Sequence, residues 1–216
     1  MQINPDKYRA VVFDLDGTLY NNKGLPMKLI LGDLRNMWVL GAERKARKQI
    51  KGQDYQNAEG VYKALFDKMA EVKKSLTAEE ARRWYEEKYM PLQVSVLRMY
   101  FEARPLVTEL LEAMRNRGLK CILYSDYGHE VEKLQALDID PKLFDATLSA
   151  PELGGLKPSR KSMERLMEKF GLDAATTLYV GDREDTDGDS ARPFGIEFVN
   201  VKQPKENWDE LLKAFL

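Results

Sequence analysis

The sequence predicts an α/β protein, a doubly wound parallel sheet with an all-helical segment inserted after its first strand. Three observations lead to this prediction: a buried-strand pattern near the start, purely helical patterns over residues 21–101, and alternating strand and helix patterns from Arg104 onward. Strands separated by single helices are joined by right-handed crossovers, which produce a parallel sheet covered on both faces.

The first predicted strand is Ala10–Phe13, whose β-branched and aromatic residues are typical of a strand buried on both faces. Two carboxylates, Asp14 and Asp16, follow it, and Gly17 comes next. Carboxylates at the end of a buried strand need a cation, hydrogen bonds or a proton to offset the cost of desolvation. Gly17 can adopt positive φ angles, so the chain can turn here and bring the two acids together. The simpler alternative is a strand-to-loop junction in which one Asp caps a turn.

The segment 21–101 contains apolar residues at helical spacing and no strand pattern. Thr77 and Glu80 form a capping box that begins one of its helices, and we expect Pro91 to interrupt that helix. The predicted helices cover 25–40, 61–72, 77–90 and 92–101. We therefore expect a helical cap domain at 21–101, inserted into a core domain formed by 1–20 and 102–216.

Beyond the insertion, Pro105 is expected to be a first helical residue, with Gly118 ending its helix. Further helices are predicted over 129–137, 190–194 and 208–215, and another follows Lys157-Pro158 and ends at Gly171. The remaining strands are predicted at 121–124, 146–148, 178–180 and 196–201.

The bulk composition is that of an ordinary globular protein. The chain has 34 Lys and Arg residues against 35 Asp and Glu, a net charge of −1 that gives no indication of a nucleic-acid or membrane partner. Cys121 is the only cysteine and is expected to be a small buried hydrophobe. Residues 1–9 lack the apolar core of a signal peptide, and no stretch is apolar enough to span a bilayer. We therefore expect a cytoplasmic protein.

Polar and ionisable residues follow several of the predicted strands. The carboxyl ends of parallel strands meet at one edge of the sheet, where open α/β sheets bind ligands, so we expect these side chains to converge. Several acids, one hydroxyl and one lysine around a point suit Mg²⁺ and a phosphoryl group, because the cations neutralise the phosphoryl oxygens. The residues of this set are Asp14, Asp16, Ser125, Lys157, Asp182 and Asp187.

These residues resemble the four motifs of the haloacid dehalogenase (HAD) superfamily, and they occur in the family's order along the whole chain. The matching segments are Asp14-Leu15-Asp16-Gly17-Thr18, Ser125, Lys157-Pro158 and Gly181-Asp182 with Asp187. The helical insertion resembles the C1-type cap of the subfamily that includes phosphoglycolate phosphatase and β-phosphoglucomutase. The resemblance implies a Rossmann-like core, a hydrolase activity and Mg²⁺ as the cofactor.

The resemblance also implies a role for each residue of the first motif. Asp14 is expected to be the nucleophile, to form an aspartyl-phosphate and to ligate Mg²⁺. Asp16 is expected to protonate the leaving group and then activate water, while its backbone carbonyl binds the metal.

The other motifs supply binding groups by the same resemblance. Ser125 is expected to hydrogen-bond a phosphoryl oxygen, and Lys157 to hold both Asp14 and the phosphate. Asp182 is expected to be a metal ligand, and Asp187 to orient metal-bound water or Lys157. Asp126 follows Ser125 where the family often has Asn, and a further acid there is unfavourable unless it points away from the phosphate.

Each residue taken alone has a simpler interpretation. Ser125 is a possible N-cap of the following helix, Lys157 a possible exposed lysine, and Gly181-Asp182 a common turn. The acids Asp185, Asp187 and Asp189 resemble part of a calcium loop, but the Glu that such a loop requires is missing.

The prediction is therefore a Mg²⁺-dependent phosphatase acting on a small phosphorylated metabolite. Asp16 favours phosphoryl chemistry, since the dehalogenases of the superfamily lack the second acid. The alternatives are a phosphomutase of the β-phosphoglucomutase type and a non-catalytic binding protein with the same fold. We expect no nucleic-acid or membrane partner, and either a monomer or a homodimer.

The substrate itself is not identified by these motifs. Candidate residues that recognise the leaving group are Tyr20 at the hinge and Arg35, Arg44 and Lys45 on the insertion. The alternative for the basic cluster 44–48 is a solvated helix face.

Overall fold

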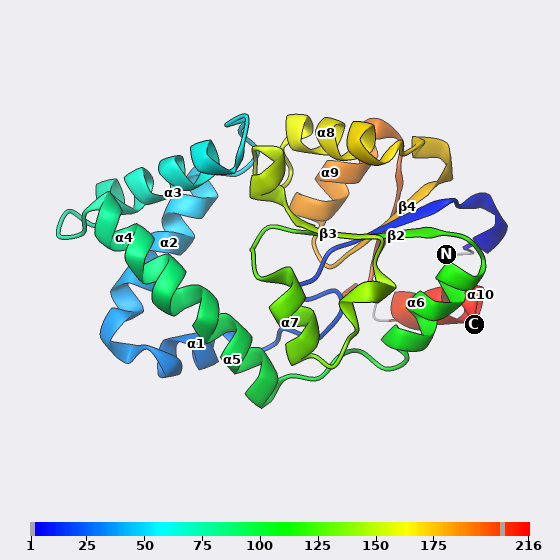
Figure 1. Ribbon diagram of the computed structural model, residues 1–216, viewed down its shortest axis with the longest axis horizontal. Coiled ribbons are helices and arrows are strands. Elements are labelled where there is room, and N and C mark those ends of the chain that lie inside the picture. The colour runs from blue at the N-terminus through cyan, green and yellow to red at the C-terminus, as the bar shows by residue number, and fades with distance from the viewer. Residues whose placement is uncertain (1–2, 204–205) are drawn as a thin grey trace.

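The core of the protein is a five-stranded, fully parallel sheet with the strand order β3-β2-β1-β4-β5 (Figure 1). The computed structural model describes residues 3–203 and 206–216. The strands are β1 (Ala10–Phe13), β2 (Lys120–Ser125), β3 (Ala146–Ser149), β4 (Thr177–Gly181) and β5 (Glu197–Asn200). In the centre, Phe13 of β1 is in register with Leu123 of β2 and Val180 of β4. The predicted α/β fold with a doubly wound parallel sheet is confirmed.

Helices cover both faces of the sheet because β1 is apolar at every position. Val11 and Phe13 pack against one group of helices, and Val12 packs against the other, as expected for side chains that alternate along a strand. The first group is α6 (Val107–Asn116), α7 (Glu130–Ala136) and α10 (Glu206–Phe215), and the second is α8 (Arg160–Phe170) and α9 (Asp189–Ala191). Figure 1 shows the two groups on opposite sides of the strands.

Residues 21–101, all of them described, form helices and turns and contain no strand. Their helices lie to one side of the sheet in Figure 1 and share a separate core that is rich in aromatic residues. They are α1 (Leu25–Gly32), α2 (Met37–Ile50), α3 (Ala58–Val72), α4 (Ala78–Trp84) and α5 (Met90–Tyr100). The division into a cap domain at 21–101 and a core domain at 1–20 and 102–216 stays a prediction.

Short helical turns complete the described structure. Two have the wider π-helical form, Tyr85–Tyr89 and Glu184–Gly188. The others are 3₁₀ turns at Pro5–Lys7, Leu34–Asn36, Pro141–Leu143, Ala150–Leu153, Ala174–Thr176 and Arg192–Phe194. Over 3–203 and 206–216, none of the helices combines the length and hydropathy needed to cross a membrane.

Three local predictions were wrong. The single helix expected over 25–40 is interrupted at Asp33, which has a non-helical φ of −145°, and α2 then continues to Ile50. Pro91 does not interrupt the helix that begins at Thr77, because the π-helical turn Tyr85–Tyr89 joins α4 to α5 and Pro91 lies in the first turn of α5. There its missing N–H group costs little. Helix α6 begins at Val107 rather than Pro105, since Leu106 adopts a positive φ of 59° and cannot be helical. The capping box at Thr77 and the buried state of Cys121 are confirmed.

The two chain segments that connect the sheet to the inserted helices lie side by side. Tyr20 and Ala103 form an antiparallel bridge. The backbone N–H of Arg104 donates to the Leu19 carbonyl at 2.7 Å, and its guanidinium donates to the carbonyls of Thr18 (2.7 Å) and Gly17 (3.1 Å). Arg104 therefore holds the turn that follows Asp14 and Asp16.

A buried ion pair links α2 to the core. Glu43, fully buried, receives a hydrogen bond from Arg47 at 2.6 Å. The Arg47 guanidinium also donates to the Asp126 carbonyl (3.1 Å) and the Tyr85 hydroxyl (3.2 Å), and it lies 4.0 Å from the centre of the Tyr127 ring. One side chain thus joins the inserted helices to the loop after β2.

We expect Arg47→Met to lower the free energy of unfolding by about 3–5 kcal/mol, because it leaves the Glu43 carboxylate buried without its partner. The double variant Glu43→Gln/Arg47→Met removes the unpaired charge and is expected to recover part of the loss. Urea unfolding followed by circular dichroism measures both.

The matched control is Arg82→Met, which breaks the exposed pair Arg82–Glu86 of the same spacing and is expected to cost less than about 1 kcal/mol. Equal losses in Arg47→Met and in the double variant would show that the buried charge is not the cause.

Candidate active site

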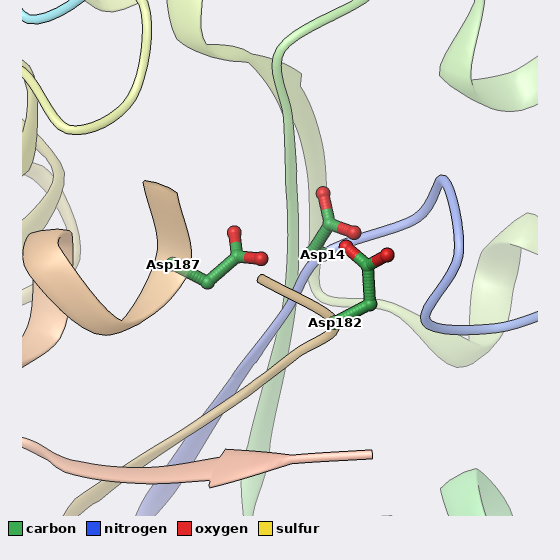
Figure 2. A group of neighbouring side chains, drawn as sticks. All are labelled: Asp14, Asp182 and Asp187. Atoms are coloured by element: carbon green, nitrogen blue, oxygen red, sulfur yellow. The ribbon is translucent and has the colours of Figure 1, made fainter. Parts of the chain in front are cut away.

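Three buried carboxylates meet at the carboxyl ends of β1 and β4. Asp14 directly follows β1, Asp182 directly follows β4, and Asp187 lies in the π-helical turn after β4. One oxygen from each side chain lies within 4.8 Å of the others, and Figure 2 shows the carboxylates turned toward one another. Because β1 and β4 are neighbours in register, the sheet itself brings Asp14 and Asp182 together.

Lys157 lies among these carboxylates and is only 2% exposed. Its Nζ atom is 2.7 Å from Asp14 Oδ1 and 2.7 Å from Asp187 Oδ1, and it also donates to the Tyr124 carbonyl at 3.2 Å. Burial lowers the pKa of Lys157, but the adjacent carboxylates outweigh burial and hold the pKa well above its usual value. The interpretation of Lys157 as an exposed lysine is therefore wrong.

Asp14 is buried and hydrogen-bonded at both oxygens. Thr18 Oγ1 donates to Asp14 Oδ2 at 2.8 Å, while Lys157 binds the other oxygen. Burial raises the pKa of Asp14 well above its usual value, and the charges of Asp187 and Asp182 raise it further, while Lys157 opposes the shift. The site holds more negative charge than its single buried lysine neutralises.

The donor set fits a divalent cation. Burial, together with the charge of Asp187, raises the pKa of Asp182, and the half-exposed Lys202 approaches Asp182 Oδ2 at 3.1 Å. Three carboxylates facing one buried lysine would be neutralised by a doubly charged ion, and carboxylate oxygens are the ligands that Mg²⁺ prefers. Asp14, Asp182 and Asp187 are the residues that could hold such an ion.

The turn that follows Asp14 and Asp16 comes so close to Asp182 that position 17 requires glycine. Gly17 has a φ of +101°, and a Cβ atom there would overlap the Asp182 carboxylate and lie 2.6 Å from Asn22 Nδ2. No other residue fits this turn without moving Asp182 away from Asp14.

The Asp16 carboxylate binds neither Lys157 nor the other three carboxylates but has partners of its own. Lys133 Nζ lies 2.9 Å from Asp16 Oδ2, and the Tyr20 hydroxyl donates to Oδ1 at 2.7 Å. Its backbone carbonyl, the predicted metal ligand, accepts a hydrogen bond from Asn22 Nδ2 at 3.2 Å. The carboxyl group is thus fixed beside the carboxylate cluster rather than in it.

Lys133 was not predicted as a site residue, although it is completely buried. A signal was present in the sequence: Lys133 shares one helical stripe with Glu130, Leu134 and Leu137, so a charged residue occupies the inward face of α7. A buried lysine requires a partner, and Asp16 is that partner.

Ser125 ends β2 and is buried, with its Oγ accepting a hydrogen bond from the Tyr127 N–H at 3.2 Å. It is not an N-cap, since α7 begins at Glu130 with His129 before it. Asp126 Oδ1 accepts from the Lys157 N–H at 2.8 Å, so this acid holds the loop that carries Lys157. Burial raises its pKa.

The acids that suggested a calcium loop have separate partners. Asp185 pairs with Arg183 at 2.6 Å and with Lys51 at 2.6 Å, whereas Asp187 binds Lys157. Asp189 is exposed on α9. Salt bridges within the protein, rather than a shared calcium ion, therefore account for the positions of Asp185 and Asp187.

Comparison with known proteins agrees with this geometry. The family model of haloacid dehalogenase-like hydrolases matches residues 8–195. The chain therefore belongs to the haloacid dehalogenase-like hydrolase family, which confirms the resemblance carried by its four motifs.

A curated relative is the glyceraldehyde 3-phosphate phosphatase of Methanocaldococcus jannaschii, 32% identical over 120 residues, which are 54% of this chain and 50% of the relative. The chain thus matches about half the length of that relative.

Solved structures share the fold. A predicted phosphoglycolate phosphatase from Haemophilus somnus 129PT is 22% identical with a TM-score of 0.58, and the match covers 90% of this chain and 85% of that one. A 2-haloacid dehalogenase from Pseudomonas syringae pv. tomato DC3000 is 16% identical with a TM-score of 0.61, covering 89% and 86%.

Glu130 on α7 is expected to make the stability of the protein depend on pH. Its Oε1 is buried without a hydrogen-bond partner among the described residues, and burial raises its pKa to about 7. The folded state therefore keeps a proton that the unfolded state loses at lower pH, so this residue makes stability fall as pH rises toward 7. We expect Glu130→Gln to remove this decline and to be about 1–3 kcal/mol more stable than the wild type at pH 8.

Urea unfolding midpoints at pH 5.5 and pH 8 measure this effect. Glu112→Gln on the exposed side of α6 is the control and is expected to keep the wild-type pH dependence. An unchanged pH dependence in Glu130→Gln would assign the decline to another group.

Proposed function

We propose that the protein is a Mg²⁺-dependent phosphatase that hydrolyses a small phosphate monoester through an aspartyl-phosphate on Asp14. The observation that carries the proposal is the position of Lys157, which binds Asp14 and Asp187 with one buried ammonium group. A lysine held there favours the anionic form of Asp14 and attracts the phosphoryl oxygens.

In the first half of the proposed reaction, Asp14 attacks phosphorus and the bond to the leaving oxygen breaks. Asp16 gives a proton to that oxygen, and the hydrogen bonds from Tyr20 and Lys133 fix its orientation. In the second half, Asp16 takes a proton from water, whose oxygen attacks phosphorus and releases Asp14. Lys157 and Ser125 hold phosphoryl oxygens in both halves.

Four residues are proposed to form the metal site: Asp14, Asp182, the carbonyl of Asp16, and Asp187 beside them. Bound Mg²⁺ would offset the negative charge of the phosphoryl oxygens as Asp14 approaches. The three clustered carboxylates support this proposal.

The helices of 21–101 are proposed to act as a cap that excludes water from the site. Two contacts support this role: Arg47 of α2 binds the Asp126 carbonyl beside the carboxylates, and Tyr20 at the connecting segment binds Asp16. Substrate entry then requires movement about the paired segments at Tyr20 and Ala103.

We expect the wild type to release p-nitrophenol from p-nitrophenyl phosphate in Mg²⁺ and to lose this activity in EDTA. Asp14→Asn keeps the size of the side chain but removes the nucleophile, so kcat is expected to fall more than about 10⁴-fold. Asp209→Asn, an exposed substitution on α10, is the control and is expected to retain full activity.

Activity that survives in Asp14→Asn, or that is equal in Mg²⁺ and EDTA, would contradict the proposed mechanism. The absence of activity from folded, Mg²⁺-loaded wild type would favour a phosphomutase or a binding protein.

A further inference from the structure

A large cleft opens beside the carboxylate site, between α2 and the loops that follow β2 and β4. Its volume is about 840 Å³, whereas the hollow directly at the carboxylates has only about 60 Å³. We assign the phosphoryl group to the smaller space because Asp14 and Lys157 line it. The two spaces share four lining residues, Asp126, Tyr127, Arg183 and Thr186, so a phosphate at Asp14 directs the rest of its ester into the cleft.

The cleft is rich in cations, and most of them already have partners. Arg47 pairs with Glu43, while Lys51 and Arg183 share Asp185. Five cationic residues line the cleft against three acids, namely Arg44, Arg47, Lys48, Lys51 and Arg183 against Asp126, Asp185 and Asp189. Of these acids, Asp126 accepts a hydrogen bond from the Lys157 N–H. Asp185 forms salt bridges with Lys51 and Arg183.

Two cations of the cleft differ from the rest. Arg44 and Lys48 make no salt bridge with any carboxylate of the described residues, and both are exposed. They are four residues apart on α2, so they lie on one face of the helix, where like charges repel each other. Lys45 and Arg35, which the sequence also suggested, are exposed but do not line the cleft.

We propose that the substrate carries a second anionic group on its leaving-group side and that Arg44 and Lys48 bind it. This inference rests on the proposed function, since it assumes that a phosphate occupies the carboxylate site. A carboxylate or a second phosphate satisfies both cations, because arginine binds either group with two parallel hydrogen bonds. A neutral hydroxyl or aldehyde leaves both cations without a partner. The preference therefore differs from the substrate in the name of the archaeal relative, glyceraldehyde 3-phosphate, which carries no second anionic group.

Two matched pairs of esters test this preference. Glyceraldehyde 3-phosphate and 3-phosphoglycerate differ only in an aldehyde against a carboxylate. The mono- and bisphosphates of propane-1,3-diol differ in a hydroxyl against a second phosphate. We expect wild-type kcat/KM to be at least about 10-fold higher for the anionic member of one pair, and the pair that responds identifies the second group.

The variant Arg44→Gln/Lys48→Gln is expected to reduce this anionic preference about 10- to 100-fold, as for lost hydrogen bonds to charged groups. Lys45→Gln lies on the same helix outside the cleft and is expected to keep the wild-type preference. Equal and measurable rates for both members of each pair in the wild type would overturn the proposal, and so would an unchanged preference in the double variant.

Binding measurements distinguish a failure of this inference from a failure of the proposed function. Calorimetry with Asp14→Asn, in Mg²⁺, gives the affinities for the two propanediol phosphates without turnover. Tighter binding of the bisphosphate that disappears when Arg44→Gln/Lys48→Gln is added supports the cleft assignment, even if the wild type hydrolyses neither ester. Equal binding of both in Asp14→Asn, together with equal hydrolysis of the carboxylate pair, would overturn it.

Discussion

The ammonium group of Lys157 is the interaction on which the site depends. It lies between Asp14 and Asp187, 2.7 Å from an oxygen of each, and all three side chains are buried. Two carboxylates that close repel each other strongly at low dielectric, and the ammonium group between them offsets that repulsion. The chain places this cation on the loop before α8, and Asp126 fixes the loop by accepting the Lys157 N–H.

The remaining geometry follows from the sheet. Parallel pairing of β1 with both β2 and β4 places Asp14, Ser125 and Asp182 at one edge. Gly17 then leaves room for Asp182, and Arg104 holds the same turn from the other side. The inserted helices contact this edge through Arg47. The cleft lined by Arg44 and Lys48 therefore lies beside the carboxylates. The carboxylate site and the proposed substrate cleft thus lie at the same edge of the sheet.

Much of this arrangement could be predicted from the sequence. The buried run before Asp14 and the spacing of the later strands determine the sheet, and acids at strand ends indicate the site because parallel strands converge there. The predicted groups Asp14, Lys157, Asp182 and Asp187 do lie together. Local patterns failed at two backbone features that no side-chain spacing signals. These are the π-helical turn before Pro91 and the positive φ of Leu106, whose side chain is 48% exposed.

Partners that are distant in sequence were the least predictable. Lys133 and Asp16 are separated by 117 residues, and the Arg47 guanidinium reaches the Asp126 carbonyl across 79. Spacing carries no information about such pairs, although a lysine on an inward helical stripe signals that a partner exists.

The most direct test of this account is mass spectrometry of acid-quenched reactions with a phosphate monoester in Mg²⁺. We predict a phosphate group on Asp14. With p-nitrophenyl phosphate, whose leaving group departs without a proton, we predict more of it in Asp16→Asn, because loss of the base then slows hydrolysis of the intermediate more than its formation. Product release with no phosphate on Asp14 in either protein, or phosphate on a different residue, would contradict the account.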